Sequence, residues 1–587
     1  MNAALSACAL ARHRTALHLM GLLLILANGL NGLGQTCSNS ICGPYSASMY
    51  GCLSGTSSGT GCLNNNNVGF YTTSPANGSF SGSFEGIDSC NVSSSECEKK
   101  PPYDIDPNGG VGSYQFLQSL NTVVQAWDKT QGTGIFVSNK NGTTAVPQAS
   151  SRPFAPQLGK HCGSPGGDVL AMYDYLDSRF VIAFKARWVD NNKANHYSFC
   201  VAVSSQDDLQ GSNGVSNWSA YDFVLDNVLP TDSKAGNAYY APDYAKLGTW
   251  NDGNFYVSWD LINPSGFQLY GSVICAVDRA NMVAGNGANP MVCYVYWPAG
   301  QTKGAWNPGK VPTLIHTILP ADIESSAAQP PAGRSPLFLA IVNPNNGKGG
   351  PCTSGPCTSN QLALWSWASY SGGQAPTFLT VNEYTPGCYD DSAPYNTVCV
   401  LEPGGYKVDS VGDRLMHRLV YRNFGITPAA TASPMGEMLA AAHAIDDPTS
   451  GLTDIRYYLL RLTGSDSASV LVDGDMTSSS LNLFMPSLAF DKNGDLGVVY
   501  STSANCSDST CYPALYFDVV PYLRPPDNPT LVVQGTAENQ ERHGNWGDYF
   551  GAGLDPTDDL TFWGTGEYFD TNETSSLVTW QTRVVKM

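Results

Sequence analysis

The chain has 587 residues, and its 49 acidic side chains outnumber its 30 basic ones, which gives a formal net charge of −19 at pH 7. Such a surface repels phosphate backbones, so the composition disfavours nucleic-acid binding and we expect no nucleic-acid partner. Charged residues make up only 13% of the chain. Its polar surface must therefore come from Ser, Thr, Asn and Gly, as is common in exported β proteins.

An export signal is the first predicted element. Arg12 and Arg14 precede an apolar run over 17–27, and small residues after the run offer cleavage sites, which is the pattern of a secretory signal. The run is shorter than the roughly 20 residues that a membrane-spanning helix needs, and no second run of this kind follows. We therefore assign residues 1–34 to a signal peptide. The expected location is extracellular or periplasmic, with no membrane span.

Cysteine usage agrees with export. The chain has 17 cysteines, and removal of Cys8 with the leader leaves an even number, which suits oxidised pairs. Residues 35–110 are rich in Gly, Ser, Asn and Cys and show hardly any periodic apolar pattern, so we predict an irregular, disulfide-stapled lead segment there. The complete connectivity stays open, but local spacing and neighbouring predicted strands bring together Cys162 and Cys200, Cys275 and Cys293, Cys352 and Cys357, Cys388 and Cys399, and Cys506 and Cys511.

Residues 111–587 are predicted to form one all-β domain. Short strands continue to the end of the chain, and the best helical candidate, 278–284, is a short segment in a loop. Seven strands each begin a meander of three or four strands, and four-stranded antiparallel units repeated radially are the blades of a β-propeller. We therefore predict a seven-bladed β-propeller of four-stranded antiparallel blades. The seven strands begin near Tyr114, Asp168, Asp243, Leu337, Asp413, Pro486 and Asp548.

Two long segments, 408–425 (VDSVGDRLMHRLVYRNFG) and 546–583 (beginning WGDY), carry a resemblance to a known family. They resemble a family of large secreted bacterial proteins with sialidase-like, BNR-type propeller folds. Shorter matches are YAKLG at 244–248, CAVDRANM at 275–282 and LPAD at 319–322. The resemblance covers roughly residues 114 to 587 and leaves out the Cys-rich lead segment. It implies the fold and export, while the family itself has no established activity.

Four aspartates hold equivalent places at the starts of predicted innermost strands: Asp168, Asp243, Asp413 and Asp548. A propeller usually binds at one mouth of its channel, where the innermost strands converge. Rotational pseudo-symmetry should therefore gather these aspartates into an acidic ring, in which like charges raise one another's pKa or are neutralised by cations. The alternative is that each Asp caps its own turn by accepting backbone N–H bonds.

Three arginines follow Asp413 at intervals of four residues: Arg414, Arg418 and Arg422. In an extended strand their side chains leave the same face, where together they could clamp a carboxylate or sulfate. The set resembles the arginine triad of sialidases. However, sialidases draw those arginines from different blades, and their Tyr/Glu pair and complete Ser-x-Asp-x-Gly-x-Thr-Trp box cannot be placed in this sequence. The alternative is that the arginine stems pack between blades and pair with aspartates.

Glycoside hydrolysis needs two carboxyl groups about 5 to 9.5 Å apart, with one of them protonated. The acidic ring could supply such a pair. Asp548 and Asp413 are the first catalytic candidates, with Tyr549 or Arg414 supporting the transition state. The sequence contains no Gly-x-Ser-x-Gly elbow, no His-Glu-x-x-His and no phosphate-binding GxxxxGK(S/T).

Two functions stay open. The first is a propeller that binds extracellular polysaccharide or a cell-surface ligand at one mouth of its channel, with Asp168, Asp243 and the three arginines as binding residues. The alternative is a carbohydrate-active enzyme, either a glycoside hydrolase or a polysaccharide lyase, that uses the carboxylates of the channel rim. No cofactor is identified, although a structural calcium ion suits such an acidic, oxygen-rich chain. We expect a monomer.

Overall fold

The computed structural model describes a large part of the chain beyond its first 40 residues. The predicted signal peptide, most of the predicted lead segment, Cys352, Cys357 and Cys388 lie outside the described residues. The described residues are 41–42, 52–53, 82–88, 105–135, 148–149, 161–163, 165–190, 194–210, 217–232, 238–262, 269–296, 315, 317–342, 359–386, 398–425, 435–447, 449–526, 528–539, 546–571 and 578–587.

Many inner strands form because apolar residues fill both of their faces, whereas outer strands such as β12 (Trp218–Val224) and β28 (Ala468–Met476) are only half-buried. In β29 (Asn482–Phe490) and β30 (Leu496–Ser503) every residue is buried, which is expected when a neighbouring sheet covers each face. The turn between them uses Asp491, whose carboxylate accepts the N–H groups of Asn493 and Asp495 over 2.8 and 2.9 Å. Gly494 completes the turn with a φ of 90°, a conformation that favours glycine. Residues 491–495 thus form the turn of the hairpin between β29 and β30.

Most strands belong to antiparallel sheets in which four consecutive strands lie side by side. In the first half of the chain these are β4 (Asn108–Val111), β5 (Gln115–Ser119), β6 (Val123–Asp128) and β7 (Gly134–Ile135), with β8 (Gln148–Ala149) beside β6; β9 (Leu170–Asp174), β10 (Arg179–Val189), β11 (Asn195–Ser204) and β12 (Trp218–Val224); and β15 (Ala241–Thr249), β16 (Asn254–Ile262), β17 (Leu269–Asp278) and β18 (Val292–Tyr296).

The second half of the chain repeats this arrangement. An eight-stranded sheet contains β19 (Leu319–Ile323), β20 (Leu337–Ile341), β21 (Ser359–Ser366) and β22 (Thr377–Pro386), joined through a parallel β19–β25 pair to β25 (Leu419–Asn423), β26 (Glu437–Asp446), β27 (Thr453–Leu462) and β28 (Ala468–Met476). A further sheet consists of β29, β30, β31 (Ala514–Val520) and β32 (Thr530–Gln534). Short two-stranded pairs are β1 (Ile41–Cys42) with β2 (Cys52–Leu53), β13 (Thr231–Asp232) with β14 (Ala238–Tyr239), and β23 (Val398–Leu401) with β24 (Lys407–Asp409).

The last sheet joins an early strand of the chain to its last three strands. It contains β33 (Gly551–Leu554), β34 (Phe562–Thr571) and β35 (Val578–Lys586), and its fourth strand is β3 (Gly82–Glu85), which pairs antiparallel with β35. Residues 82–85 and 108–110 thus contribute strands to sheets, although they fall within the segment 35–110 for which an irregular structure is predicted. The early strand β3 is thus the fourth strand of this sheet, next to β35.

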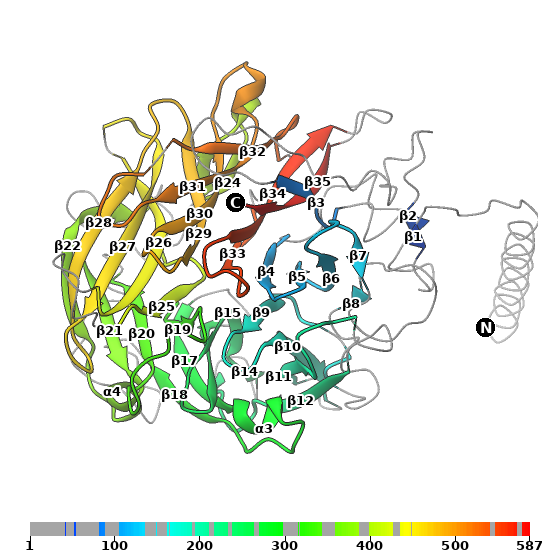
Figure 1. Cartoon of the computed structure of the whole chain (residues 1–587), viewed down its shortest axis with the longest axis vertical. Helices are drawn as coiled ribbons and strands as arrows, with labels where there is room; N and C mark the ends of the chain where they lie inside the picture. Colours follow the sequence, from blue (N-terminus) through cyan, green and yellow to red (C-terminus); the bar gives the residue numbers. More distant parts are fainter. Residues whose placement is uncertain are drawn as a thin grey trace, which may run out of the picture.

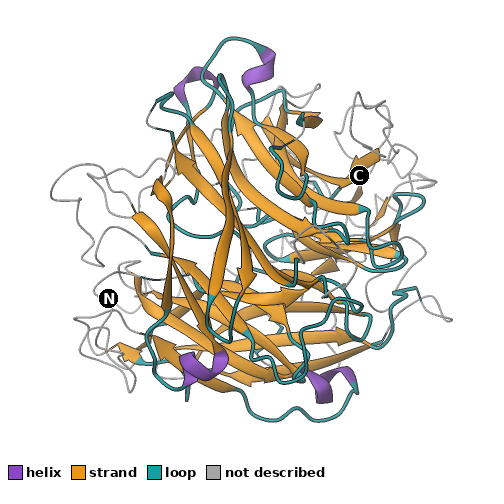
Figure 2. Cartoon of the chain, turned by 60° about the vertical axis from the view of Figure 1, so that its left-hand side comes forward, coloured by secondary structure: helices purple, strands orange, loops and turns teal. Residues whose placement is uncertain are grey.

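The first strand of each four-stranded set lies near the centre of the molecule. Figure 1 shows β4, β9, β15, β19, β25, β29 and β33 around that centre, with strands such as β12, β18, β22 and β28 towards the outside. Contacts between successive inner strands link β4 to β9, β9 to β15, β15 to β19, β19 to β25, β25 to β29, β29 to β33 and β33 to β4. Figure 2 shows how sparse the helices are among the strands. The architecture is all-β and consistent with a β-propeller.

Two short α-helices lie at strand ends among the described residues. α3 (Arg279–Val283) begins after Asp278, whose carboxylate accepts the N–H of Asn281 over 3.2 Å, and it confirms the helix predicted at 278–284. α4 (Trp367–Ser371) begins after Ser366 with a capping box. No helix in the described part of the chain has both the length and the apolar character needed to cross a membrane.

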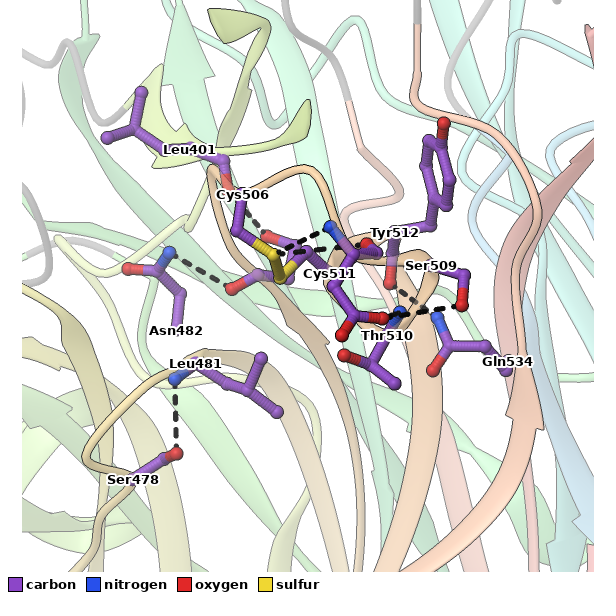
Figure 3. The surroundings of a disulfide bond; sticks show 12 residues. Leu401, Ser478, Leu481, Asn482, Cys506, Ser509, Thr510, Cys511, Tyr512 and Gln534 are labelled. Carbon is purple, nitrogen blue, oxygen red and sulfur yellow. Dashed lines mark hydrogen bonds between the residues drawn. A yellow bond between two sulfur atoms is a disulfide. The ribbon is translucent and has the colours of Figure 1, made fainter. Parts of the chain in front are cut away.

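Three of the disulfide pairs that sequence spacing brings together are formed. Cys162 bonds to Cys200 and Cys275 to Cys293, with Cα atoms 5.7 and 4.0 Å apart. Cys506 bonds to Cys511 across the short loop after β30. Figure 3 shows this loop, where the Gln534 side chain donates to the carbonyl of Tyr512 over 2.9 Å. Disulfides persist in oxidising compartments, so these bonds are consistent with an exported protein.

Candidate functional site at the centre of the sheets

Two of the predicted aspartates, Asp168 and Asp243, meet at one lysine. Asp168 precedes β9, Asp243 lies in β15, and Lys185 comes from β10. The Nζ atom of Lys185 lies 3.0 Å from Oδ2 of Asp168 and also binds Oδ1 of Asp243. The backbone N–H of Tyr244 donates to the same Oδ2 of Asp168 over 3.1 Å. The Asp168 side chain is therefore tied to β10 of the same sheet and to β15 of the next sheet.

The surroundings lower the pKa of Asp168 and raise the pKa of Asp243. Burial raises the pKa of Asp243; Lys185 opposes this rise, and the negative charge of Asp168 adds to it. Burial also acts to raise the pKa of Asp168, but the charge and hydrogen bond of Lys185 outweigh it, so that pKa falls below its ordinary value. Both side chains reach solvent, because Asp243 is 38% exposed and Asp168 is 14% exposed. A proton on the pair is thus held preferentially by Asp243.

A buried lysine lies beside this pair. The Nζ atom of Lys246 lies 3.2 Å from the ring centre of Tyr244 and 3.7 Å from that of Tyr549, between two stacked rings. Burial lowers the pKa of Lys246 well below its ordinary value. The hydroxyl of Tyr549 donates to the carbonyl of Ala245 over 3.0 Å, and the hydroxyl of Tyr244 donates to the carbonyl of Asp548 over 3.0 Å. These bonds tie β15 to the segment that leads into β33.

The other two predicted aspartates lie in the same region. Asp413 is fully buried, and Arg414 donates to both of its carboxylate oxygens over 2.6 and 3.1 Å. The Arg414 guanidinium lies 4.6 Å from the ring centre of Tyr244. Asp548 is half-buried, and its backbone N–H donates to Oδ1 of Asp106 over 2.6 Å. Burial raises the pKa of Tyr244 well above its ordinary value, the charges of Asp548, Asp413 and Asp106 add to the rise, and the charge of Arg414 opposes it.

The three arginines have separate acidic partners and do not form the common binding face expected from their parity. β25 begins only at Leu419, so strand alternation does not apply to the residues before it. The Nε atom of Arg418 donates to Oδ2 of Asp322 over 2.9 Å, and Nη1 of Arg422 donates to Oδ1 of Asp559 over 3.0 Å. Both arginines are buried. They match the alternative of packing between sheets with carboxylate partners, whereas Arg414 stays at the centre, half-buried.

Sequence reasoning missed several residues that surround the predicted aspartates. Lys185 comes from a second strand rather than from an inner one, and Asp106 lies in the predicted lead segment. Lys246 and Tyr244 belong to the YAKLG match at 244–248, which drew attention to the segment without assigning a role to either. Lys246 could have been noticed from the sequence, because it lies between Ala245 and Leu247 and a lysine is rarely buried without a partner.

Comparisons with known proteins give loose structural likenesses. No protein-family model matches the sequence, and no curated protein matches it. A Trypanosoma rangeli sialidase in complex with sialic acid superposes with a TM-score of 0.32 at 10% identity, over 76% of this chain and 56% of that chain. A Penicillium chrysogenum α-L-arabinanase complexed with arabinobiose gives 0.28 at 9% identity, over 59% and 94%. A Cellvibrio cellulosa α-L-arabinanase complexed with arabinohexaose gives 0.27 at 11% identity, over 63% and 96%. At these scores the superpositions carry no argument about function.

Proposed function

We propose that this chain is a secreted, seven-bladed β-propeller that binds an extracellular glycan at its centre and hydrolyses a glycosidic bond there. The observation that carries the proposal is the pair of solvent-reaching carboxyls, Asp168 and Asp243, which share Lys185 and are shifted in opposite directions in pKa. A carboxyl group whose pKa is raised by burial and by a neighbouring carboxylate is suited to act as a general acid. Seven blades are supported by the closed series of contacts between the inner strands.

The proposed roles follow from burial and partners. Asp243 is the proposed general acid, because burial and, to a smaller extent, the negative charge of Asp168 raise its pKa. The two share one ammonium group, and Asp168 is engaged in that ion pair and in the hydrogen bond from Tyr244, so we do not give it the second catalytic role. The second catalytic carboxylate is Asp548, which is half-buried and acts on both Lys246 and Tyr244. Asp413, the other initial candidate, is fully buried against Arg414 and serves to position it.

A propeller that only binds glycan is the second candidate. One observation favours it: the hydroxyls of Tyr244 and Tyr549 donate to backbone carbonyls, and Asp413 is bound by Arg414, so these groups stabilise the centre as it stands. In that case Asp168, Asp243 and Arg414 supply hydrogen bonds to sugar hydroxyls, as the half-buried polar groups of the centre. In this case the chain binds the glycan and does not cleave it.

An array of polysaccharides incubated with the purified chain separates the two candidates. Retention and released reducing ends are scored on each polysaccharide. We expect at least one polysaccharide to release reducing ends, and we expect Asp548→Asn to lower that release by about 10²- to 10⁴-fold while the polysaccharide is still retained. The matched control is Asp252→Asn at an exposed turn, which should cleave at the original rate. Retention without any release on every polysaccharide contradicts the hydrolase and supports the binding protein.

A further inference from the structure

Two of the basic side chains at the centre are already engaged within the chain. Lys185 is held by two carboxylates, and Lys246 is buried between two tyrosine rings. Arg414 is the third basic residue of the centre, and 22% of its side chain is exposed to solvent. Whether Arg414 can pair with an anionic group of a ligand therefore decides which glycans the centre accepts.

Asp413 holds Arg414 in a two-point ion pair. The Nε–Oδ1 distance is 2.6 Å and the Nη2–Oδ2 distance is 3.1 Å. The carboxylate is fully buried, and the guanidinium lies 4.6 Å from the ring centre of Tyr244. A carboxylate or sulfate of a ligand would need the same fork of N–H donors for bidentate binding. Arg414 thus reaches solvent with its charge already balanced by Asp413.

The other two arginines that follow Asp413 are engaged in the same way. Arg418 donates to Asp322 over 2.9 Å and to Glu324 over 3.2 Å, and Arg422 donates to Asp559 over 3.0 Å. Their side chains are only 6% and 3% exposed. A clamp of three arginines for a ligand carboxylate, as in a sialidase, is therefore not assembled at this centre.

The charge that reaches solvent at the centre is mainly negative. The side chain of Asp243 is 38% exposed and that of Asp168 is 14% exposed, and both share the single ammonium group of Lys185. Sugar hydroxyls can donate hydrogen bonds to such carboxyl groups. An anionic group beside them would lose hydration and meet like charge without gaining an unpaired cation.

One exposed arginine lies on the rim of this region. Arg187 follows Lys185 by two residues on β10, which places it about 7 Å further along the strand and on the same face. Its Nε atom donates to the side chain of Asn195 over 3.1 Å. Its charge therefore acts beside a neighbouring sugar unit and not on the unit held at the carboxyl groups.

We propose that the centre accepts glycans whose units carry no carboxylate or sulfate, and that Asp413 determines this specificity because it keeps Arg414 from pairing with the ligand. This specificity rests on the proposed function, since it belongs to the same glycan site. Asp413 is then a specificity-determining residue and not one of the two catalytic carboxyls.

Asp413→Asn changes the charge of the pair with little change in shape. The amide oxygen can still accept an N–H of Arg414, but the negative charge that balances the guanidinium is lost. Arg414 then faces the centre as an uncompensated cation and can pair with a carboxylate of the ligand. We expect this variant to bind acidic glycans about ten-fold more tightly than the original chain does.

Retention on immobilised polysaccharides measures the specificity. The neutral probes are arabinan, galactan and xylan, and the acidic probes are polygalacturonate and alginate. Polygalacturonate is also compared with its fully methyl-esterified form, which has the same backbone without the charges. Sodium chloride at about 0.15 M screens the long-range repulsion that comes from the net charge of −19. We expect the original chain to retain at least one neutral polysaccharide and neither acidic one.

Asp252→Asn is the control matched in charge, because it also removes one negative charge but lies at an exposed turn. It should show no gain on polygalacturonate or alginate, whereas Asp413→Asn should gain. Urea unfolding shows whether each variant is folded. If Asp413→Asn does not fold, polygalacturonate and its methyl ester are still compared on the original chain.

Retention tests the specificity, and the release of reducing ends tests the hydrolysis separately. The specificity is overturned if no polysaccharide is retained, if an acidic one is retained better than every neutral one, or if free polygalacturonate is retained better than its ester. A folded Asp413→Asn variant with the preference of the original chain overturns it too. Retention of neutral polysaccharides without release supports the specificity and contradicts the hydrolase, whereas release from acidic polysaccharides alone does the reverse.

Discussion

Lys246 is a buried lysine that links the residues on the two sides of the proposed site. Its Nζ atom is buried between the rings of Tyr244 and Tyr549, and no hydrogen-bond acceptor among the described residues reaches it. The two rings supply attraction through their faces, which compensates in part for the lost hydration. Because Asp548 and Asp168 also raise its pKa against the effect of burial, the lysine couples the two halves of the proposed site. A change at any of these residues should therefore affect the others.

Glu324 provides a pH-dependent test of the polar interior. Burial raises its pKa to about 7 although Arg418 opposes the shift, whereas an unfolded glutamate titrates near 4.3. The folded state therefore holds a proton that the unfolded state releases, and the contribution of Glu324 to stability should fall as pH rises from about 4 to about 7. In Glu324→Gln the free energy of unfolding should decline less between pH 5 and pH 7.5. Urea unfolding at both pH values measures this.

The comparison with Gln is matched because its side-chain oxygen can still accept the N–H of Phe490, which donates to Glu324 over 2.6 Å. Arg418 also retains Asp322 in the variant. A pH dependence that is the same in the original chain and in Glu324→Gln would mean that this carboxyl does not titrate in the range given above.

At the residue scale, the sequence predicts the acidic groups of the centre better than the basic ones. Asp168 and Asp243 are recognisable because each comes at the start of a strand after Gly or Pro. Lys185 lies on a second strand, and only the pairing of β9 with β10 brings it back to Asp168. For Arg418 the prediction of a common face is wrong, because Arg414 and Arg418 precede β25 and the alternation of side chains in a strand does not apply to them.

At the scale of elements, the pairing of β3 with the C-terminal strand β35 gives a direct test of stability. Phe84 of β3 is 1% exposed and lies against Trp127, with ring centres 5.6 Å apart. We expect Phe84→Ala to lower the free energy of unfolding by about 3–5 kcal/mol, because it removes a buried ring from a packed core. Urea denaturation measures the change.

The control for this prediction is Phe378→Ala in β22, since that ring is 39% exposed and should contribute far less. Equal losses from the two substitutions would show that the Phe84 ring contributes no more to stability than an exposed ring does. An unchanged midpoint for Phe84→Ala would show the same.

The sequence predicts most elements, but some of them begin at other residues than predicted. The short helix at 278–284 and the strand that follows Asp168 are formed as expected. The fourth meander begins earlier than predicted, at β19, because Leu319–Ile323 contains Pro320 and an Asp and does not alternate like a strand. β3 could not be predicted, since its partner β35 lies about 500 residues further along the chain and no local pattern records such a pairing.

At the scale of the whole molecule, repetition is what makes the fold predictable. Four-stranded sets recur along the chain, so apolar strands return at similar intervals and the all-β class follows from the sequence. How the inner strands meet is a long-range property, and it decides which side chains share the centre. Asp106 and Asp548 illustrate this, because they are in contact while their positions differ by 442 residues.

The central claim is that Asp243 donates a proton to a glycosidic oxygen at the meeting point of these sheets. The most direct measurement is the rate at which reducing ends are released, by the original chain and by Asp243→Asn, from the polysaccharide that the original chain cleaves best. We predict a loss of about 10²- to 10⁴-fold, with retention of the polysaccharide unchanged and with the original chain losing activity as pH rises above the pKa of Asp243. Undiminished release by a folded Asp243→Asn variant would contradict the account.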